Sequence, residues 1–244
     1  METKRAVIFA NGEMPDEAAI RARLRPGDWI VAADGGTRHA LACGRVPNLI
    51  IGDLDSLPPG SRKGLERQGV QMIVHPADKN ETDLELALLE VAANQVGQVL
   101  VVGALGGRLD QMLANIQLLS RPELAHLDVE MTDGHQHIHL VRPEVTIEGK
   151  PGDLVSLLPL CQSVEGVKTQ GLEWPLDSEV LHFGHGRGVS NRMIDHAAHV
   201  QVKGGLLLCI HADQHVSEVV VGGPEPVDQT GCSIVDAGSQ PGRG

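Results

Sequence analysis

The sequence is poor in aromatic residues: it has no tyrosine, and aromatic residues make up 2% of its 244 positions. Its core must therefore be aliphatic, and hydrophobic residues are abundant enough for one, at 41%. Basic residues are also scarce, because 20 lysines and arginines face 32 acidic residues and give a net charge of −12. This charge argues against nonspecific binding to nucleic acid or to an anionic membrane surface.

The four cysteines are scattered and form no closely spaced pair. Cys43, Cys161, Cys209 and Cys232 are therefore expected to be reduced thiols rather than a disulfide framework. The apolar run that follows Arg5 is too short for a signal peptide, and no apolar run approaches the length of a membrane span. The sequence thus predicts a cytoplasmic protein with no membrane segment.

The first half of the sequence alternates short apolar runs with helix-forming stretches. Such runs are typical of strands buried on both faces. Strands are expected at residues 5–10, 29–33, 49–52, 71–74 and 98–102, with helices between them. This order predicts a mostly parallel, Rossmann-like α/β domain over residues 1–141.

Two carboxylates follow the strand at 49–52. Asp53 and Asp55 are two residues apart, so in an extended chain they point the same way and lie roughly 6.6 Å apart. Magnesium takes oxygen ligands and is often held by one or two carboxylates together with substrate phosphates. The alternative is an Asp-rich turn in which Ser56 and Pro58 complete the exit from the strand.

A second strand also ends in an acid, followed by two glycines. Asp34, Gly35 and Gly36 lie between the strand at 29–33 and a predicted helix. Backbone N–H groups at such a junction can approach a phosphate or a ribose. The two glycines are equally compatible with a tight turn that has no ligand.

A third polar junction precedes the helix that begins near residue 83. Thr82 and Glu85 form a capping box, which places Asp83 in the first helical turn, where its charge is favoured. This stabilisation of the helix N-terminus is enough to explain why an acid occupies position 83. It does not account for Asp78 and Lys79, which precede it at the end of another strand.

A fourth junction combines glycines, an arginine and an acid. Gly106 and Gly107 precede Arg108, Asp110 and Gln111. Arg108 offers a planar fork suited to phosphate oxygens. A salt bridge between Arg108 and Asp110 is the alternative. Because four strand ends carry such residues, we expect them to share one cleft.

From residue 142 the pattern changes to short alternating runs separated by turns. This predicts a small all-β sandwich or barrel domain over residues 142–212, followed by a disordered tail over 213–244. Just before it, His135, His137 and His139 alternate. On a strand they would share a face, which favours a half-exposed surface over a zinc site, since no cysteine or acid completes the set.

The motifs together resemble one known family. They are Asp34-Gly35-Gly36, Gly52-Asp53-Leu54-Asp55-Ser56, Lys79 through Thr82-Asp83 to Ala87-Leu88, and Gly106 through Gln111. In this order the set closely resembles the thiamine pyrophosphokinase family. Further similarity lies in Gly171 through Leu176, His182-Phe183-Gly184 and Val189-Ser190-Asn191. Asn80 departs from the pattern, because the family commonly has an acid there.

The resemblance implies a transferase that moves the terminal pyrophosphoryl group of ATP to the hydroxyethyl group of thiamine. It implies that magnesium lies among Asp53, Asp55 and Asp83, with Asp34, Gly35, Gly36, Asp78, Lys79, Thr82, Arg108, Asp110 and Gln111 around the nucleotide. Two other functions are weighed against this one. They are a diphosphokinase for another small alcohol, such as a hydroxymethyl pterin, and a nucleotide-binding module without catalysis.

The resemblance also implies a thiamine-binding group in the second domain. Trp174 could stack on a flat ring, and Ser190 and Asn191 could hydrogen-bond to it. A buried core position is the alternative for Trp174. Because this group and the acidic residues lie in different domains, a homodimer with a composite active site is expected, against an ordinary interdomain cleft within one chain.

Overall fold

The first half of the chain alternates strands and helices, as predicted. The computed structural model describes residues 4–57 and 60–214. The strands of this half are β1 (Lys4–Phe9), β2 (Trp29–Ala33), β3 (Leu49–Gly52), β4 (Gln71–Val74), β5 (Val96–Val102) and β6 (Asp128–Thr132). The helices are α1 (Glu17–Arg23), α2 (Thr37–Ala42), α3 (Ser61–Arg67), α4 (Asp83–Ala92) and α5 (Leu109–Leu118), with 3-10 turns η1 (Asp34–Gly36) and η2 (Pro122–Leu124).

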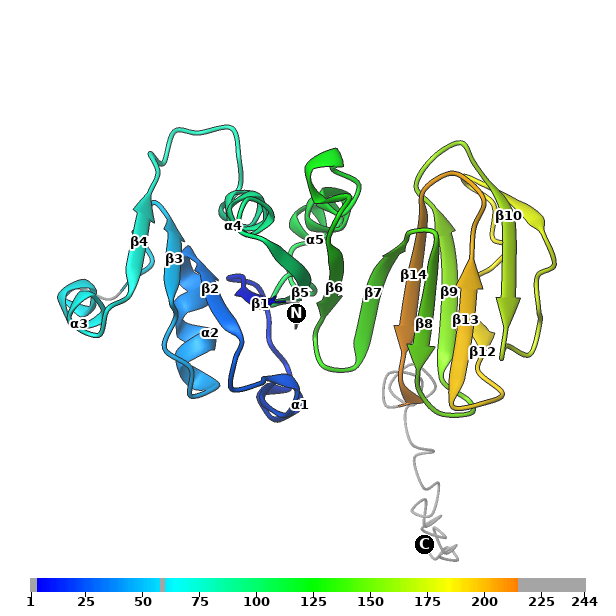
Figure 1. The fold of residues 1–244 in the computed structure, drawn as a ribbon, viewed down its shortest axis with the longest axis horizontal. Helices are drawn as coiled ribbons and strands as arrows, with labels where there is room; N and C mark the ends of the chain where they lie inside the picture. The colour runs from blue at the N-terminus through cyan, green and yellow to red at the C-terminus, as the bar shows by residue number, and fades with distance from the viewer. Residues whose placement is uncertain (1–3, 58–59, 215–244) are drawn as a thin grey trace, which may run out of the picture.

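The second half is built from strands. They are β7 (Gln136–Val141), β8 (Glu144–Glu148), β9 (Leu154–Pro159), β10 (Ser163–Gln170), β11 (Glu179–His182), β12 (Asn191–Arg192), β13 (Ala197–Gln201) and β14 (Leu207–Ala212). Figure 1 shows these strands at one end of an elongated molecule and the α/β half at the other. The predicted fold class, a mostly parallel α/β region followed by an all-β region, is confirmed.

A single ten-stranded sheet runs through both regions, in the order β12-β9-β14-β7-β6-β5-β1-β2-β3-β4. The strands from β6 to β4 in that order are parallel, whereas β7 pairs antiparallel with β6 and with β14. A second, four-stranded sheet has the order β11-β10-β13-β8. One layer of the sandwich is therefore the end of the long sheet, which passes through the boundary predicted at residue 141.

Strand β1 shows why its apolar run has no polar face. Ala6 and Ile8 belong to one buried cluster, while Val7 and Phe9 belong to another on the opposite face of the sheet. Successive strand side chains point to opposite faces, so a strand covered on both sides must be apolar throughout. A third cluster fills the sandwich and includes Val155 of β9 together with residues of β10 and β13.

The tail prediction concerns residues 213–244, most of which lie outside the described residues. Asp213 and Gln214 are described. The Asp213 backbone N–H donates to the His135 carbonyl oxygen at 3.0 Å, and Gln214 Nε2 donates to the Pro151 carbonyl oxygen at 2.7 Å. These first two residues of the predicted tail are thus bound to the sandwich. In the described part of the chain, no helix combines the length and the apolar character that a membrane crossing needs.

Candidate active site

Three carboxylates converge where β2, β3 and α4 meet. Asp34 follows β2, Asp53 follows β3, and Asp83 begins α4. One carboxylate oxygen of each lies within 4.8 Å of the others. Like charges this close repel one another unless a cation or a proton intervenes. Oxygen donors in such a group suit a hard cation such as Mg²⁺.

The cluster differs from the predicted set in one member. Asp34 occupies the third position for which Asp55 was predicted. Asp55 is exposed, and its Oδ1 accepts a hydrogen bond from Ser56 Oγ at 3.1 Å. Its backbone N–H donates to Asp53 Oδ1 at 3.3 Å. A direct role of Asp55 in metal binding stays a prediction.

Gly52 makes room for the convergence. Its φ of +147° is rarely adopted by residues that have a side chain. A Cβ at this position would lie 2.9 Å from Asp34 Cβ and 3.0 Å from Asp83 Oδ1. Asp34 and Leu54 also have positive φ, at 42° and 62°. Such backbone strain is concentrated at functional sites, where the surrounding structure maintains it.

Asp34 carries an unsatisfied buried atom. The residue is 5% exposed, and its Oδ1 has no hydrogen-bond partner among the described residues. A buried carboxylate oxygen without a donor is costly, and coordination to a cation removes that cost. The residues present therefore fit a bound magnesium ion.

Lys79 lies beside the cluster, with Nζ 2.9 Å from Asp83 Oδ1. Burial opposes its charged form. The hydrogen bond to Asp83 and the charges of Asp83, Asp53 and Asp34 outweigh burial and raise the pKa of Lys79. Lys79 is thus held as a cation at the edge of the acidic cluster.

The cluster opens into a cavity of about 890 Å³. Six predicted residues line this cavity: Asp34, Lys79, Thr82, Asp83, Arg108 and Gln111. Thr82 also caps α4, because its Oγ1 accepts from the Glu85 N–H at 3.1 Å. The volume lies in the range of small-molecule sites. The lining includes three of the four predicted strand-end segments, those after β2, β4 and β5, while Asp53 after β3 belongs to the adjoining acidic cluster.

The sequence interpretation missed one wall of the cavity. It is formed by residues after β1 and on α2, including Asn11, Glu13, Arg38 and His39. Burial lowers the pKa of His39, whose Nε2 lies 2.8 Å from the Gly12 carbonyl oxygen. In the sequence, Asn11-Gly12 indicated only the end of a strand. The parallel order predicted that β1 would end at the same sheet edge, and that signal could have identified this wall.

Arg108 and Asp110 form a salt bridge, which was the alternative to phosphate binding predicted for the segment after β5. Arg108 Nε and Nη2 donate to the two carboxylate oxygens of Asp110 at 3.1 and 2.6 Å. These bonds lower the pKa of Asp110 and raise that of Arg108. Both side chains are exposed. Arg108 lines the cavity but already has an anionic partner.

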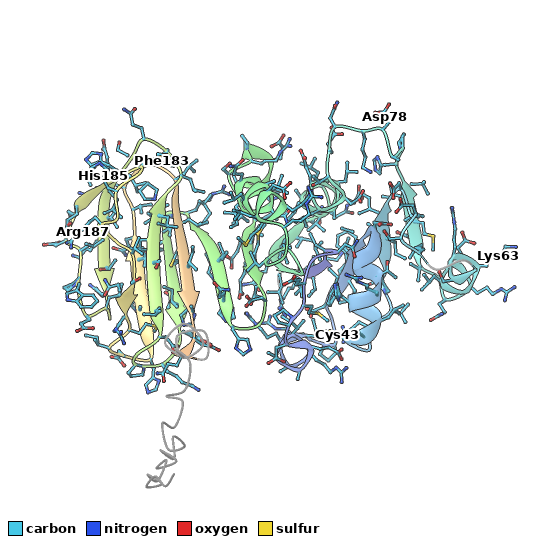
Figure 2. All side chains as sticks on the ribbon, turned by 180° about the vertical axis from the view of Figure 1, so that it is seen from behind. Cys43, Lys63, Asp78, Phe183, His185 and Arg187 are labelled. Atoms are coloured by element: carbon cyan, nitrogen blue, oxygen red, sulfur yellow. The ribbon has the colours of Figure 1, made fainter. Side chains whose placement is uncertain are left out.

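The two glycines after Asp34 are required by packing. A Cβ on Gly35 would lie 2.4 Å from the Asn11 side chain, and one on Gly36 would lie 1.9 Å from the Phe9 carbonyl oxygen. This supports the tight-turn interpretation, and a contact with nucleotide stays a prediction. Asp78 is exposed on the loop between β4 and α4 and does not line the cavity (Figure 2).

The candidate ring-binding residues form their own group in the sandwich. Asn191 is buried and binds the backbone of Trp174 at both ends, with Nδ2 donating to its carbonyl oxygen at 2.7 Å and Oδ1 accepting from its N–H at 3.1 Å. Trp174 is 50% exposed, so the alternative of a buried core position is wrong. Ser190 is also exposed, with a φ of 58°.

The alternating histidines form ion pairs and hydrogen bonds. His135 contacts Asp16 and Asp213, and His137 Nδ1 lies 2.7 Å from Glu130 Oε1. Burial lowers the pKa of His139. Among the residues that the structure describes, the only three-ligand group suited to a metal is the acidic cluster.

Comparison with known proteins adds two family matches and several relatives. Residues 21–131 match "Thiamin pyrophosphokinase, catalytic domain", and residues 137–207 match "Thiamin pyrophosphokinase, vitamin B1 binding domain". The thiamine pyrophosphokinase of Bacillus subtilis (strain 168) is 29% identical over 186 residues, covering 75% of this chain and 86% of the relative. Thiamine pyrophosphokinase 1 of Oryza sativa subsp. japonica is 28% identical over 209 residues, covering 73% and 76%. The crystal structure of the Bacillus subtilis thiamine pyrophosphokinase superposes with a TM-score of 0.76 at 26% identity, covering 86% of this chain and 99% of that one.

Proposed function

This chain belongs to the thiamin pyrophosphokinase family, and we propose that it transfers the pyrophosphoryl group of ATP to thiamine. The thiamine hydroxyl oxygen forms a bond to the β-phosphorus, and the bond from that phosphorus to the α-phosphate oxygen breaks. The hydroxyl loses its proton, and the products are thiamine diphosphate and AMP. The observation that carries this proposal is the acidic cluster at the base of a cavity within the family's catalytic region.

Asp34, Asp53 and Asp83 would hold magnesium in this cavity. The ion supplies charge neutralisation at phosphate oxygens when it is bound. We propose that Asp55, whose backbone N–H donates to Asp53 Oδ1, contributes to the same site through an intervening water. Lys79 places a fixed positive charge next to the same carboxylates, where negative charge develops during transfer.

The cavity residues also orient the reactants. Gln111 and Thr82 supply polar groups to the cavity lining, and Arg108 adds a second cation. Phosphoryl-transfer enzymes act mainly by positioning and electrostatic stabilisation. The carboxylates that face the cavity can accept the proton that the hydroxyl loses.

We place thiamine between two subunits of a homodimer. Asn191 lies on β12, at the edge of the sheet, and seven inter-strand steps separate β12 from β2. At about 4.8 Å per step this is roughly 34 Å, too far for Trp174 to reach the acidic cluster of its own chain. Figure 2 likewise shows Phe183 of the sandwich and Asp78 of the loop between β4 and α4 in opposite halves of the molecule. A two-fold dimer can bring each sandwich to the partner's cavity.

The reaction is tested with ATP labelled at the γ-phosphorus. With magnesium and thiamine, we expect AMP and labelled thiamine diphosphate in equal amounts. A hydroxymethyl pterin in place of thiamine is the control for the rival alcohol, and ATP alone is the control for a binding module. Formation of ADP, or of no product from thiamine, would contradict the proposal.

The composite site is tested by subunit exchange. Asp53→Asn disables the metal cluster, and Trp174→Ala removes an exposed ring while leaving the core intact. Each variant alone should be nearly inactive. A mixed dimer has one site with both changes and one with neither, so activity should return on mixing. If mass measurements show exchanged dimers and activity stays absent, the site is formed within one chain.

A further inference from the structure

Three cationic side chains line the cavity: Lys79, Arg108 and Arg38. Two of them are already matched with carboxylates, Lys79 with Asp83 at 2.9 Å and Arg108 with Asp110 through two hydrogen bonds. In residues 4–57 and 60–214, Arg38 has no carboxylate within ion-pair distance. Its guanidinium donates one long hydrogen bond, from Nη2 to the Asn11 carbonyl oxygen at 3.3 Å.

Arg38 lies one helical turn beyond Asp34. The chain from Asp34 continues from the 3-10 turn η1 directly into α2, which begins at Thr37. Both side chains line the same cavity, so an arginine with unused donors faces the same space as a carboxylate of the acidic cluster.

The cavity is rich in carboxylates, so an anionic ligand needs an unpaired cation such as Arg38 to bind there. Four carboxylates line it, from Asp34, Asp83, Glu13 and Glu81, and Asp53 adds a fifth at the cluster. A polyphosphate chain entering this site meets net repulsion beyond the reach of the metal. Lys79 and Arg108 offset that repulsion less, because neighbouring acids already neutralise them. Arg38 is the cation with donors left for a new anion.

We infer that Arg38 binds phosphate oxygens of the nucleoside triphosphate, and this assignment rests on the proposed function. The planar guanidinium can hold two phosphate oxygens at once, and its long bond to the Asn11 carbonyl is easily exchanged for a charge-assisted one. The exposed side chain reaches the ligand without disturbing the core. Arg38 thereby adds a positive charge to the cavity that complements the metal cluster.

The test compares Arg38→Gln with Arg67→Gln. Arg67 is exposed on α3 and does not line the cavity, so the control makes the same change in net charge away from the site. The dissociation constant of ATP is measured by calorimetry with magnesium and without thiamine. Loss of a charged hydrogen-bonding partner should weaken binding about tenfold or more in Arg38→Gln. The control should stay within about twofold, and the difference should shrink as salt rises.

Further measurements separate the possible outcomes. Arg38→Lys, which keeps the charge but not the fork, should recover part of the affinity. In turnover assays, KM for ATP should rise in Arg38→Gln while KM for thiamine stays unchanged. Unchanged ATP binding in Arg38→Gln, or equal losses in both glutamine variants, would overturn the assignment. If the wild type binds ATP through Arg38 but forms no thiamine diphosphate, the proposed reaction fails and the phosphate site stands.

Discussion

Gly52→Ala should distort the acidic cluster, because the structure has no space for a Cβ at this position. The added carbon would lie 2.9 Å from Asp34 Cβ and 3.0 Å from Asp83 Oδ1, and the φ of +147° is unfavourable for alanine. Asp34 Cβ is attached directly to the backbone and cannot move aside as a flexible side-chain end can. The strain should therefore be relieved by moving the backbone that positions Asp34.

Two effects determine how much Gly52→Ala lowers the free energy of unfolding. An unfavourable backbone conformation costs about 1–3 kcal/mol, and overpacking costs about 1–3 kcal/mol more. Together they should lower the free energy of unfolding by about 2–6 kcal/mol, which leaves many proteins folded. For a chain of this size, the melting temperature should fall by roughly 5–20 °C.

The assay combines thermal unfolding with a magnesium titration. Gly64→Ala is the matched control, because a Cβ there meets nothing within 4 Å and the residue lies inside helix α3. It should be neutral or stabilise by up to about 1 kcal/mol, since alanine favours helix more than glycine. Magnesium should raise the melting temperature of the control but have a much smaller effect in Gly52→Ala. If Gly52→Ala melts like the wild type and keeps its turnover, the argument about close packing is wrong.

Three further changes test other parts of the structure. Asp34→Asn should cut turnover by orders of magnitude yet raise the metal-free melting temperature, because repulsion in the cluster is relieved; a fall in both would contradict this. Burial opposes ionisation of Glu130, but hydrogen bonds from its histidine and arginine partners outweigh burial and lower its pKa to about 2. Its stabilising contribution should therefore be complete above its usual pKa of 4.5 and be lost as the pH falls toward 2. In an acid titration of the free energy of unfolding, we expect this loss to be about 3 kcal/mol for the wild type and absent in Glu130→Gln. Asn191→Ala should lower the free energy of unfolding by about 1–3 kcal/mol, because the Trp174 backbone loses both partners; a chemical denaturation curve that overlays the wild type would refute this.

Local structure could be predicted from the sequence because its causes are local. The run at Ala6–Phe9 is apolar on both faces, and Thr82 caps a helix because its hydroxyl lies three residues before a free N–H. The same reasoning placed Asp53 and Asp83 at strand and helix ends that meet at one edge of a parallel sheet. These features depend on side-chain periodicity and backbone hydrogen bonding within a few residues.

Features that depend on the relative placement of distant segments could not be predicted in the same way. Alternation predicts no strand at the two residues of β12, nor does it show that this segment closes the far edge of the sheet that begins at β4. Nor does the spacing of Asp53 and Asp55 show that Asp34, from another strand, would complete the cluster. The position of a strand in the sheet and the membership of the acidic cluster depend on the order of the strands and on how closely their backbones approach one another.

The sequence by itself determined the elements, the family resemblance and most of the polar residues at the strand ends. Only the tertiary structure decided that Arg108 is paired with Asp110 while Arg38 keeps its donors, and that Trp174 is exposed. The physical reason is that partnership and exposure belong to three-dimensional neighbourhoods. The sequence gives the charge and shape of each side chain. The groups that neutralise or cover that side chain depend on how segments far apart along the chain pack together.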